Sequence, residues 1–330
     1  MQAVVAGGAG FVGSHLCDAL LADGQRVICV DNHVTGSSAN ISHLKDNPNF
    51  TMLSCDISDE LPADVAGDVI YHLASPASPP RYLERPIETL ITNSTGTQKL
   101  LERAAGCNAR FLLASTSEVY GNPLEHPQVE TYWGNVSSTG IRSCYDEGKR
   151  YAEALSMAFH RARHVDVRII RIFNTYGPRL QPEDGRALPN FVAQSLNGEP
   201  FTLYGDGRQT RSFCYVSDLV RGIRAMMESD RTTGEVVNLG NPSEIDMVTL
   251  ISRIQAITGT NLAITHGPMP PDDPVRRQPD IRKAQRLLGW QPRVTLDEGL
   301  GYTIEWFREE IARQKAGYAG GAALGSTLRG

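Results

Sequence analysis

The chain has 330 residues, of which 41% are hydrophobic and 21% are charged, and its formal net charge is −5. This length is enough to bury a large core, and the composition is that of a soluble globular protein. The negative charge and the dispersed arginines argue against a nucleic-acid partner. No apolar run approaches the roughly 20 residues needed to cross a bilayer, which argues against a membrane partner.

The cysteines and the start of the chain bear on its location. Six cysteines are scattered singly, without a C-x-x-C pair, and the chain begins directly with an apolar strand rather than a charged leader. We therefore predict a reducing, cytoplasmic location. His160 and His164 have a helical metal-type spacing, but no glutamate base accompanies them, so no metal site is predicted.

The first signal of a ligand is a glycine-rich turn between a predicted strand and a predicted helix. Gly7, Gly10 and Gly13 have the spacing G-x-x-G-x-x-G, and Phe11 and Val12 open the helix. Glycines let the backbone approach a pyrophosphate closely, and a helix N-terminus offers free N–H groups. These five residues are candidates for dinucleotide binding, and a purely structural turn is the alternative.

The ends of the following strands indicate which dinucleotide binds. Asp31 and Asn32 follow the predicted strand 26–30. An acid there accepts hydrogen bonds from the adenosine ribose and repels a 2′-phosphate, which favours NAD over NADP. Asp56, after the next strand, is a candidate for the adenine amino group, although a helix N-cap explains it equally well. Leu73 ends a further strand and is expected beside the cofactor.

Strands and helices continue to alternate as far as residue 172. Strands are predicted at 69–73, 110–114 and 167–172, and a helix at 87–105. This alternation predicts an α/β fold, a Rossmann-type doubly wound parallel sheet with helices on both faces. Ligands in such folds bind beyond the carboxyl ends of the strands.

Polar side chains follow the strand 110–114. Thr116, Ser117 and Glu118 place two hydroxyls and a carboxylate where that crevice is expected. Such a cluster usually forms a turn or a cap, but the alternation upstream favours a functional role.

A phenol and an amine lie four residues apart, at Tyr145 and Lys149, in a predicted helix. Positions i and i+4 share one helix face, and an ammonium beside a phenol lowers its pKa toward the range of an effective general base. We predict that this pair removes a proton from a substrate alcohol.

Prolines and glycines between residues 177 and 207 predict the start of a smaller α/β substrate-binding lobe. A strand at 235–240 is expected to return to the main sheet, so the two lobes interleave. Helices are predicted at 247–259 and 296–311. The predicted domains are a dinucleotide-binding domain at 1–178 and 213–241, a substrate-binding lobe at 179–212 and 242–314, and a flexible tail at 315–330.

Five stretches give the chain a specific resemblance to a known family. They are residues 75–82, 115–121, 143–150, 171–179 and 272–277. With the glycine turn, they make the chain resemble the extended short-chain dehydrogenase/reductases, and among them the UDP-glucuronate decarboxylases. Gln278 departs from that family, in which lysine is common at this position.

The resemblance implies that NAD oxidises C4 of UDP-glucuronate, that CO₂ leaves from the resulting β-keto acid, and that protonation at C5 and reduction at C4 then give UDP-xylose. It makes Tyr145 the base at O4. Lys149 lowers the pKa of that phenol and binds the nicotinamide ribose, and Thr116 shares the O4 hydrogen bond. Glu118 and Arg277 face the C5–carboxylate end, with Ser117 beside them.

The resemblance also assigns residues to the UDP portion of the substrate. Arg211 is the candidate for the diphosphate, with Asn174, Arg179 and Tyr204 nearby, and Tyr82 is a further substrate-binding candidate. A homodimer through helices at 87–101 and 145–159 is implied as well.

Two other classes of function stay open. A 4-epimerase or 4,6-dehydratase acting on another nucleotide sugar is the first, and Ser117 together with Arg277 argues against it. A non-catalytic NAD-sensing protein is the second. The presence of Tyr145, Lys149, Glu118 and Arg277 together argues against it, because a non-catalytic protein does not need this set.

Overall fold

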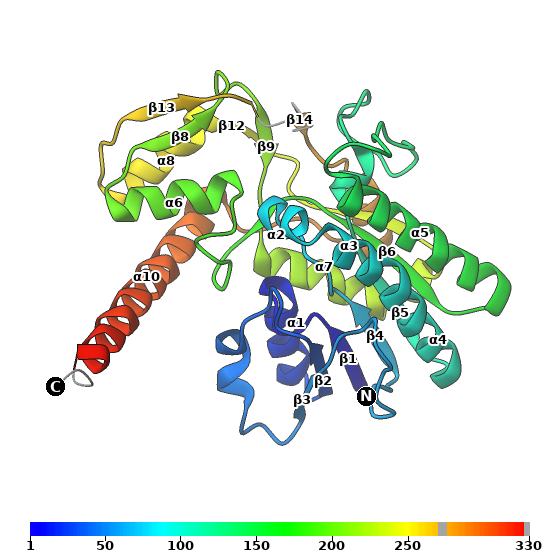
Figure 1. Cartoon of the computed structure of the whole chain (residues 1–330). Coiled ribbons are helices and arrows are strands. Elements are labelled where there is room, and N and C mark those ends of the chain that lie inside the picture. The colour runs from blue at the N-terminus through cyan, green and yellow to red at the C-terminus, as the bar shows by residue number, and fades with distance from the viewer. Residues whose placement is uncertain (270–275, 327–330) are drawn as a thin grey trace.

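The computed structural model describes residues 1–269 and 276–326, with side chains as far as residue 315. Its centre is a seven-stranded sheet with the order β11-β6-β5-β4-β1-β2-β3 (Figure 1). All neighbouring strands are parallel. The predicted Rossmann-type doubly wound sheet is thus confirmed. Its strands are β1 (Gln2–Ala6), β2 (Arg26–Asp31), β3 (Phe50–Ser54), β4 (Val69–His72), β5 (Arg110–Thr116), β6 (Val167–Ile172) and β11 (Val236–Leu239).

Apolar side chains cover both faces of the sheet, because alternate residues of a strand point to opposite faces. Along β1, Val5 belongs to one buried cluster and Val4 to the other. Helices α1 (Phe11–Ala22), α7 (Val216–Glu228) and α9 (Arg282–Leu288) pack on the first face, and α4 (Thr97–Cys107) and α5 (Ser143–Arg163) on the second. With both faces covered, polar chemistry is left to the two ends of the strands.

The helix predicted at 87–105 is interrupted. Helix α2 (Pro79–Glu84) precedes α3 (Pro86–Ile91), and a π-helical turn at Thr92–Gly96 joins α3 to α4. Gly96 permits this turn to pack closely, since a Cβ there would lie 2.7 Å from Ile57 Cδ1. Shorter 3₁₀ turns occur at Ser38–Leu44, Ser117–Tyr120 and Asp230–Thr232.

The smaller lobe has its own buried cluster, which includes Phe191, Phe201 and Leu250. Figure 1 shows it beside the main sheet, with α6 (Ala187–Asn197), α8 (Met247–Thr258) and α10 (Leu296–Ser326). Strand β8 (Phe201–Tyr204) pairs with β13 (Ile264–Gly267), and β9 (Thr210–Ser212) lies between β12 (Glu244–Asp246) and β14 (Arg276–Arg277). Strand β7 (Thr175–Tyr176) pairs with β10 (Cys214–Tyr215). The exact domain limits stay a prediction.

Helix α10 (Leu296–Ser326) begins where a helix was predicted and continues past residue 311. It therefore enters the segment predicted as a tail. Residues 327–330 lie outside the described residues, as do residues 270–275, which include part of the motif at 272–277.

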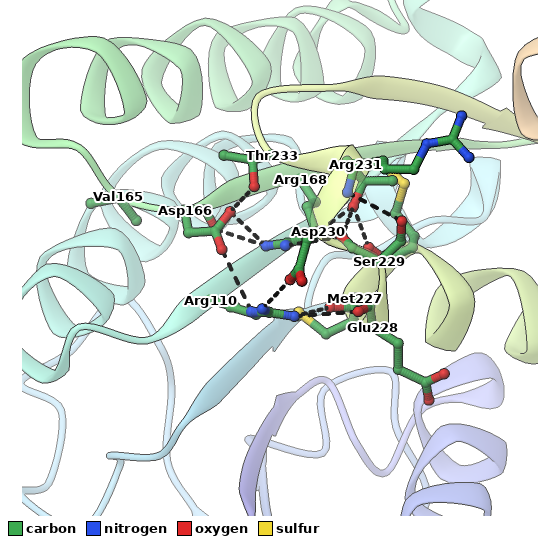
Figure 2. A network of polar contacts seen from close by, with 12 residues as sticks. Arg110, Val165, Asp166, Arg168, Met227, Glu228, Ser229, Asp230, Arg231 and Thr233 are labelled. Atoms are coloured by element: carbon green, nitrogen blue, oxygen red, sulfur yellow. Dashed lines mark hydrogen bonds and ion pairs between the residues drawn. The ribbon is translucent and has the colours of Figure 1, made fainter. Parts of the chain in front are cut away.

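A polar network closes the amino ends of β5 and β6 (Figure 2). Arg168 is fully buried there, and its guanidinium contacts Asp166 Oδ1 at 2.7 Å and Thr232 Oγ1 at 2.9 Å. Arg110 contacts Asp230 Oδ1 at 2.5 Å. These contacts tie the end of α7 and the turn after it to the start of the sheet.

Candidate functional site

A cavity of about 500 Å³ lies at the carboxyl ends of the sheet strands, between the sheet and the smaller lobe. Residues from both lobes line it. The residues predicted as a site all contribute to its lining: Gly7, Gly10, Phe11, Val12, Gly13, Asp31, Asn32, Asp56, Leu73, Tyr82, Thr116, Ser117, Glu118, Tyr145, Lys149, Asn174, Arg179, Tyr204, Arg211 and Arg277. The structure brings them together, while the role of each stays a prediction.

The glycine turn has the shape that a pyrophosphate needs. A Cβ at Gly13 would lie 2.1 Å from Gly7 O, so the turn closes only with glycine at that position. A Cβ at Gly10 would meet only Gly7 O, at 3.1 Å, and would otherwise extend into open space. Gly10 is therefore a point at which a ligand can approach the backbone closely, next to the N-terminus of α1.

Asp31 is tied to this turn. One of its carboxylate oxygens accepts a hydrogen bond from Ala9 N at 3.0 Å, and the other accepts one from His33 N at 2.8 Å. The carboxylate thus orients the glycine turn, a role that the sequence did not reveal because it depends on packing between β1 and β2.

The neighbouring Asn32 donates to Asp56 Oδ2 at 2.6 Å. Asp56 also accepts hydrogen bonds from the backbone N–H and hydroxyl of Ser58. Burial raises the pKa of Asp56, but the bonds from Ser58 and Asn32 outweigh it, so that the pKa is lowered. Asp56 is therefore a charged acceptor at the rim of the cavity.

Tyr145 and Lys149 lie one turn apart near the start of α5, as their spacing predicts. Lys149 Nζ is 5.9 Å from the centroid of the Tyr145 ring and donates to Ala114 O at 3.0 Å. Burial lowers the pKa of Lys149 to about 7, against the opposing charge of Glu153. Lys149 thus holds only part of its charge near neutral pH.

The pKa of Tyr145 differs from the expectation. Burial raises it, and the hydrogen bond with Thr116 opposes that rise only partly. Lys149, which the sequence predicted to lower this pKa, is not among its main influences; it is itself desolvated and bonded to Ala114 O. Tyr82 contributes to the burial, since its ring stacks on that of Tyr145 with the centroids 5.0 Å apart.

Glu118 lies between two arginines. Its Oε2 is 2.5 Å from Arg142 Nη2 and 3.2 Å from Arg277 Nη2. Arg277, which is 1% exposed, also donates to Ser117 O at 2.6 Å. Burial raises the pKa of Glu118, but the positive charges of Arg277, Arg142 and Arg211 overcome it and leave the pKa lowered. The carboxylate therefore stays ionised at neutral pH.

Three residues near this cluster escaped the sequence analysis. Arg142 precedes the Tyr145 motif, and only the fold shows that it contacts Glu118. Arg186 lines the cavity and donates to Asp184 Oδ2 at 2.8 Å. Asp146 is buried, and no described residue forms a hydrogen bond with its Oδ1. Burial, followed by the charge of Glu118, raises its pKa to about 7. Burial and long-range contact have no local signal in a sequence.

The residues expected around the UDP portion have different surroundings. Arg211, on β9, lies close enough to Glu118 and Arg277 to influence the pKa of both. Arg179 contacts Asp18 of α1 at 2.7 Å, and its buried Nη1 has no hydrogen-bond partner within residues 1–269 and 276–326. Arg179 is therefore next to the helix that follows the glycine turn, while Arg211 is next to the Glu118 cluster.

Two absences hold for the part of the chain that the structure describes. No helix there is long and apolar enough to cross a membrane. Nor does that part contain a group of three or more histidines, cysteines or acidic residues arranged to hold a metal ion.

The fold and the cavity define a class of protein. A parallel sheet, a glycine turn after β1, an acid at the end of β2 and a tyrosine–lysine pair beside the cavity are the features of an extended short-chain dehydrogenase/reductase. A family model described as GDP-mannose 4,6 dehydratase matches residues 4–303.

Relatives narrow the class. The chain is 52% identical over 328 residues to UDP-glucuronic acid decarboxylase 2 of Arabidopsis thaliana, covering 99% of this chain and 73% of that protein. It is 51% identical over 311 residues to UDP-glucuronic acid decarboxylase 1 of Xenopus tropicalis, covering 94% and 73%. The chain belongs to the UDP-glucuronic acid decarboxylase family, which confirms the resemblance seen in the motifs.

A solved structure shares the fold. It is the UDP-glucuronic acid 4-epimerase from Bacillus cereus in complex with UDP-glucuronic acid and NAD, with a TM-score of 0.85 and 31% identity. The match covers 94% of this chain and 99% of that one.

Proposed function

We propose that the chain binds NAD and converts UDP-glucuronate to UDP-xylose and CO₂. The observation that carries this proposal is the cluster of Glu118, Arg142 and Arg277, which lines the same cavity as Tyr145. A base for a sugar hydroxyl and cations for a sugar carboxylate are thereby available to one bound molecule.

The residues around the glycine turn fit NAD. Gly10 leaves room for a pyrophosphate, and the carboxylate of Asp31 is where a ribose diol is held in this fold. When bound, NAD supplies the oxidation at C4 and the matching reduction that completes the cycle. Lys149 is assigned to the nicotinamide ribose, because its side-chain amine lies on the cavity wall beside Tyr145.

Tyr145 accepts the O4 proton of the substrate during oxidation and returns it during reduction. Thr116 shares this hydrogen bond, since it already contacts the Tyr145 hydroxyl. The raised pKa keeps Tyr145 protonated in the chain alone. Tyr145 therefore accepts the O4 proton only after losing its own proton, and a positive charge beside the ring is needed to stabilise that phenolate.

Oxidation at C4 is what makes the carboxylate removable. The bond between C5 and the carboxyl carbon breaks and CO₂ leaves. The electron pair of that bond forms an enolate that spans C5, C4 and O4. Arg277 binds the carboxylate before this step, and a guanidinium suits it because two N–H groups match two oxygens. A proton from water then joins C5, so that each turnover takes up one proton.

Glu118 orients that water rather than donating the proton. Its pKa is lowered by Arg277 and Arg142, so it carries no proton to give at neutral pH. Arg211, Asn174 and Tyr204 are assigned to the UDP portion, together with Tyr82. Arg179 belongs to the same set, although its contact with Asp18 also brings it near the dinucleotide.

One assay tests the function. Purified protein is incubated with UDP-glucuronate and NAD, and CO₂ and the UDP-sugar product are measured. We expect CO₂ and a UDP-pentose in equal amounts. Unchanged substrate contradicts the proposal, and UDP-galacturonate without CO₂ identifies a 4-epimerase instead.

We also propose a homodimer through α3 and α5, which pack against each other. The exposed fractions of Ile87, Leu90 and Ile91 on α3 are 68%, 42% and 41%, and that of Tyr151 on α5 is 49%. Such a patch is costly to leave in water. Sedimentation should show a dimer that Ile87→Glu weakens, whereas Leu124→Glu, at an exposed loop residue, should leave it intact. A monomer in the unmodified protein contradicts this.

A cytoplasmic location is proposed because all six cysteines are free. Cell fractionation with a soluble cytoplasmic marker tests it, and recovery with another compartment contradicts it.

A further inference from the structure

Arg277 lies on a strand too short to hold a buried guanidinium by itself. Strand β14 has two residues and pairs with β9 on one side. Among the described residues, its guanidinium donates hydrogen bonds to two groups of the Ser117–Tyr120 turn, Ser117 O and Glu118 Oε2. Something else has to fix the backbone that follows Arg277.

That second support is Gln128. Its backbone N–H donates to Gln278 O at 2.9 Å, and its side-chain oxygen accepts from Gln278 N at 2.9 Å. Its backbone oxygen accepts from Asp280 N, also at 2.9 Å. Three hydrogen bonds from one residue therefore hold the backbone immediately after Arg277.

Gln128 is itself held firmly. It is fully buried, and its side-chain amide donates to Glu125 O at 2.9 Å. Asn238 of β11, also fully buried, donates to Gln128 O at 3.0 Å and to Asp280 O at 3.2 Å. The same Asn238 accepts a hydrogen bond from the Tyr120 hydroxyl at 2.7 Å. Asn238 of the central sheet thus holds both Gln128, which supports the segment after Arg277, and Tyr120, which ends the turn that Arg277 contacts.

The network continues to the helix that carries Tyr145. The Tyr120 hydroxyl accepts from Arg171 Nη1 at 3.0 Å, and Arg171 contacts both carboxylate oxygens of Glu153 on α5, at 2.9 and 2.8 Å. A continuous set of polar contacts therefore links the helix of the O4 base to the strand of Arg277.

We propose that Gln128 and Asn238 are positioning residues that hold Arg277 at the substrate carboxylate. The proposal rests on the proposed function. It adds two residues that do not line the cavity but hold one that does. Gln128→Ala removes the side-chain hydrogen bond to Gln278 N and keeps the two backbone bonds, so the segment after Arg277 is held less firmly while the Tyr145 end keeps its own contacts. The step at the carboxylate should then slow more than the oxidation at C4.

The test compares two steps in a single turnover of NAD-loaded enzyme with UDP-glucuronate. Absorbance of the reduced nicotinamide reports oxidation, and trapped CO₂ reports decarboxylation. For Gln128→Ala we expect the ratio of CO₂ release to oxidation rate to fall about 10-fold, since small misplacements of a positioned group cost this much or more.

Gln194→Ala is the matched control. Gln194 also uses both atoms of its amide, to Thr202 N at 3.1 Å and Thr202 Oγ1 at 3.0 Å, but it lies in α6 away from Arg277. We expect it to leave the ratio unchanged. Gln128→Glu keeps the oxygen that Gln278 N needs but loses the donor to Glu125 O, so it should restore part of the ratio even if Gln128→Ala folds poorly.

The outcomes separate the two proposals. If the unmodified enzyme forms neither reduced nicotinamide nor CO₂, the proposed function is wrong and this inference falls with it. If the unmodified enzyme forms both and the ratio is the same in Gln128→Ala, Gln128→Glu and Gln194→Ala, only the positioning role is wrong.

Discussion

The two ends of the central sheet each bury an arginine beside a carboxylate, but in different ways. At the amino end, Arg168 uses Nε, Nη1 and Nη2, which contact Thr232, Asp166 and Ser229 (Figure 2). At the carboxyl end, Arg277 contacts Glu118 and Ser117 O, and its buried Nε has no hydrogen-bond partner among the residues that the structure describes. Arg277 lines the cavity, and Arg168 does not.

This difference separates a structural charge from one available to a ligand. A buried guanidinium whose donors are all used by the fold stabilises that fold, whereas one with an unused donor beside a cavity retains capacity for a ligand. The carboxyl end also concentrates shifted pKa values, at Glu118, Asp146 and Lys149, as expected for a catalytic site. Burial of an arginine alone does not distinguish the two ends.

The strongest test of the carboxyl end is Tyr145→Phe. Removing the hydroxyl removes the proton acceptor at O4, so we expect the rate of CO₂ release to fall about 1,000-fold, within the range for a general base. Tyr151→Phe, on the exposed side of the same helix, is the control and should retain full activity. A small effect of Tyr145→Phe would mean that another group accepts the proton.

At the amino end, Arg168→Gln should act on stability. It leaves Asp166, Thr232 and Ser229 O without their buried donor, and we expect the free energy of unfolding to fall by about 3 kcal/mol. Denaturant unfolding measures this, with Arg208→Gln, at a side chain that is 90% exposed, as the control. The folded variant should keep its activity. Lost activity at normal stability would overturn the contrast between the two ends.

Arg277→Gln should show the opposite pattern. We expect CO₂ release to fall about 100-fold, because the carboxylate loses its bidentate partner. The free energy of unfolding should change by only about 1 kcal/mol, since Glu118 keeps Arg142 as a partner. Arg276→Gln, at the exposed neighbouring residue, is the control. A stability loss equal to that of Arg168→Gln would make Arg277 a structural residue.

The smallest expected effect concerns Asp146 and pH. Its pKa is about 7 in the folded chain, against an ordinary value of 3.8, so the folded state binds the proton more tightly than the unfolded state. The stability that this proton contributes is present in full at low pH and is lost as the pH rises through about 7. Unfolding of the wild type and of Asp146→Asn is compared at pH 5 and pH 8.

We expect the wild type to lose about 2 kcal/mol more than Asp146→Asn over this interval, because the asparagine does not ionise. Glu147→Gln, at the next and less buried position, is the control and should follow the wild type. Parallel stability curves for the wild type and Asp146→Asn would show that burial does not raise the pKa of Asp146.

Most of the main sheet was predictable because its signals are local. The apolar strands, the glycine spacing and the position of Asp31 after a strand can each be recognised within a stretch of a few residues. The interruption of the helix at 87–105 was not predicted. The π-helical turn at Thr92–Gly96 ends at Gly96, which lies against Ile57, a residue far away in the sequence, and such a contact has no local signal.

The same division applies to the site. The four-residue spacing of Tyr145 and Lys149 determined by itself that both side chains share one face of a helix. The sequence also determined the family, because its motifs are contiguous. Only the tertiary structure decided that Arg142, Glu118 and Arg277 meet, that Asp146 is buried, and that burial raises the pKa of Tyr145. Desolvation and contact between distant residues arise from packing of the whole chain, and no short stretch of sequence encodes them.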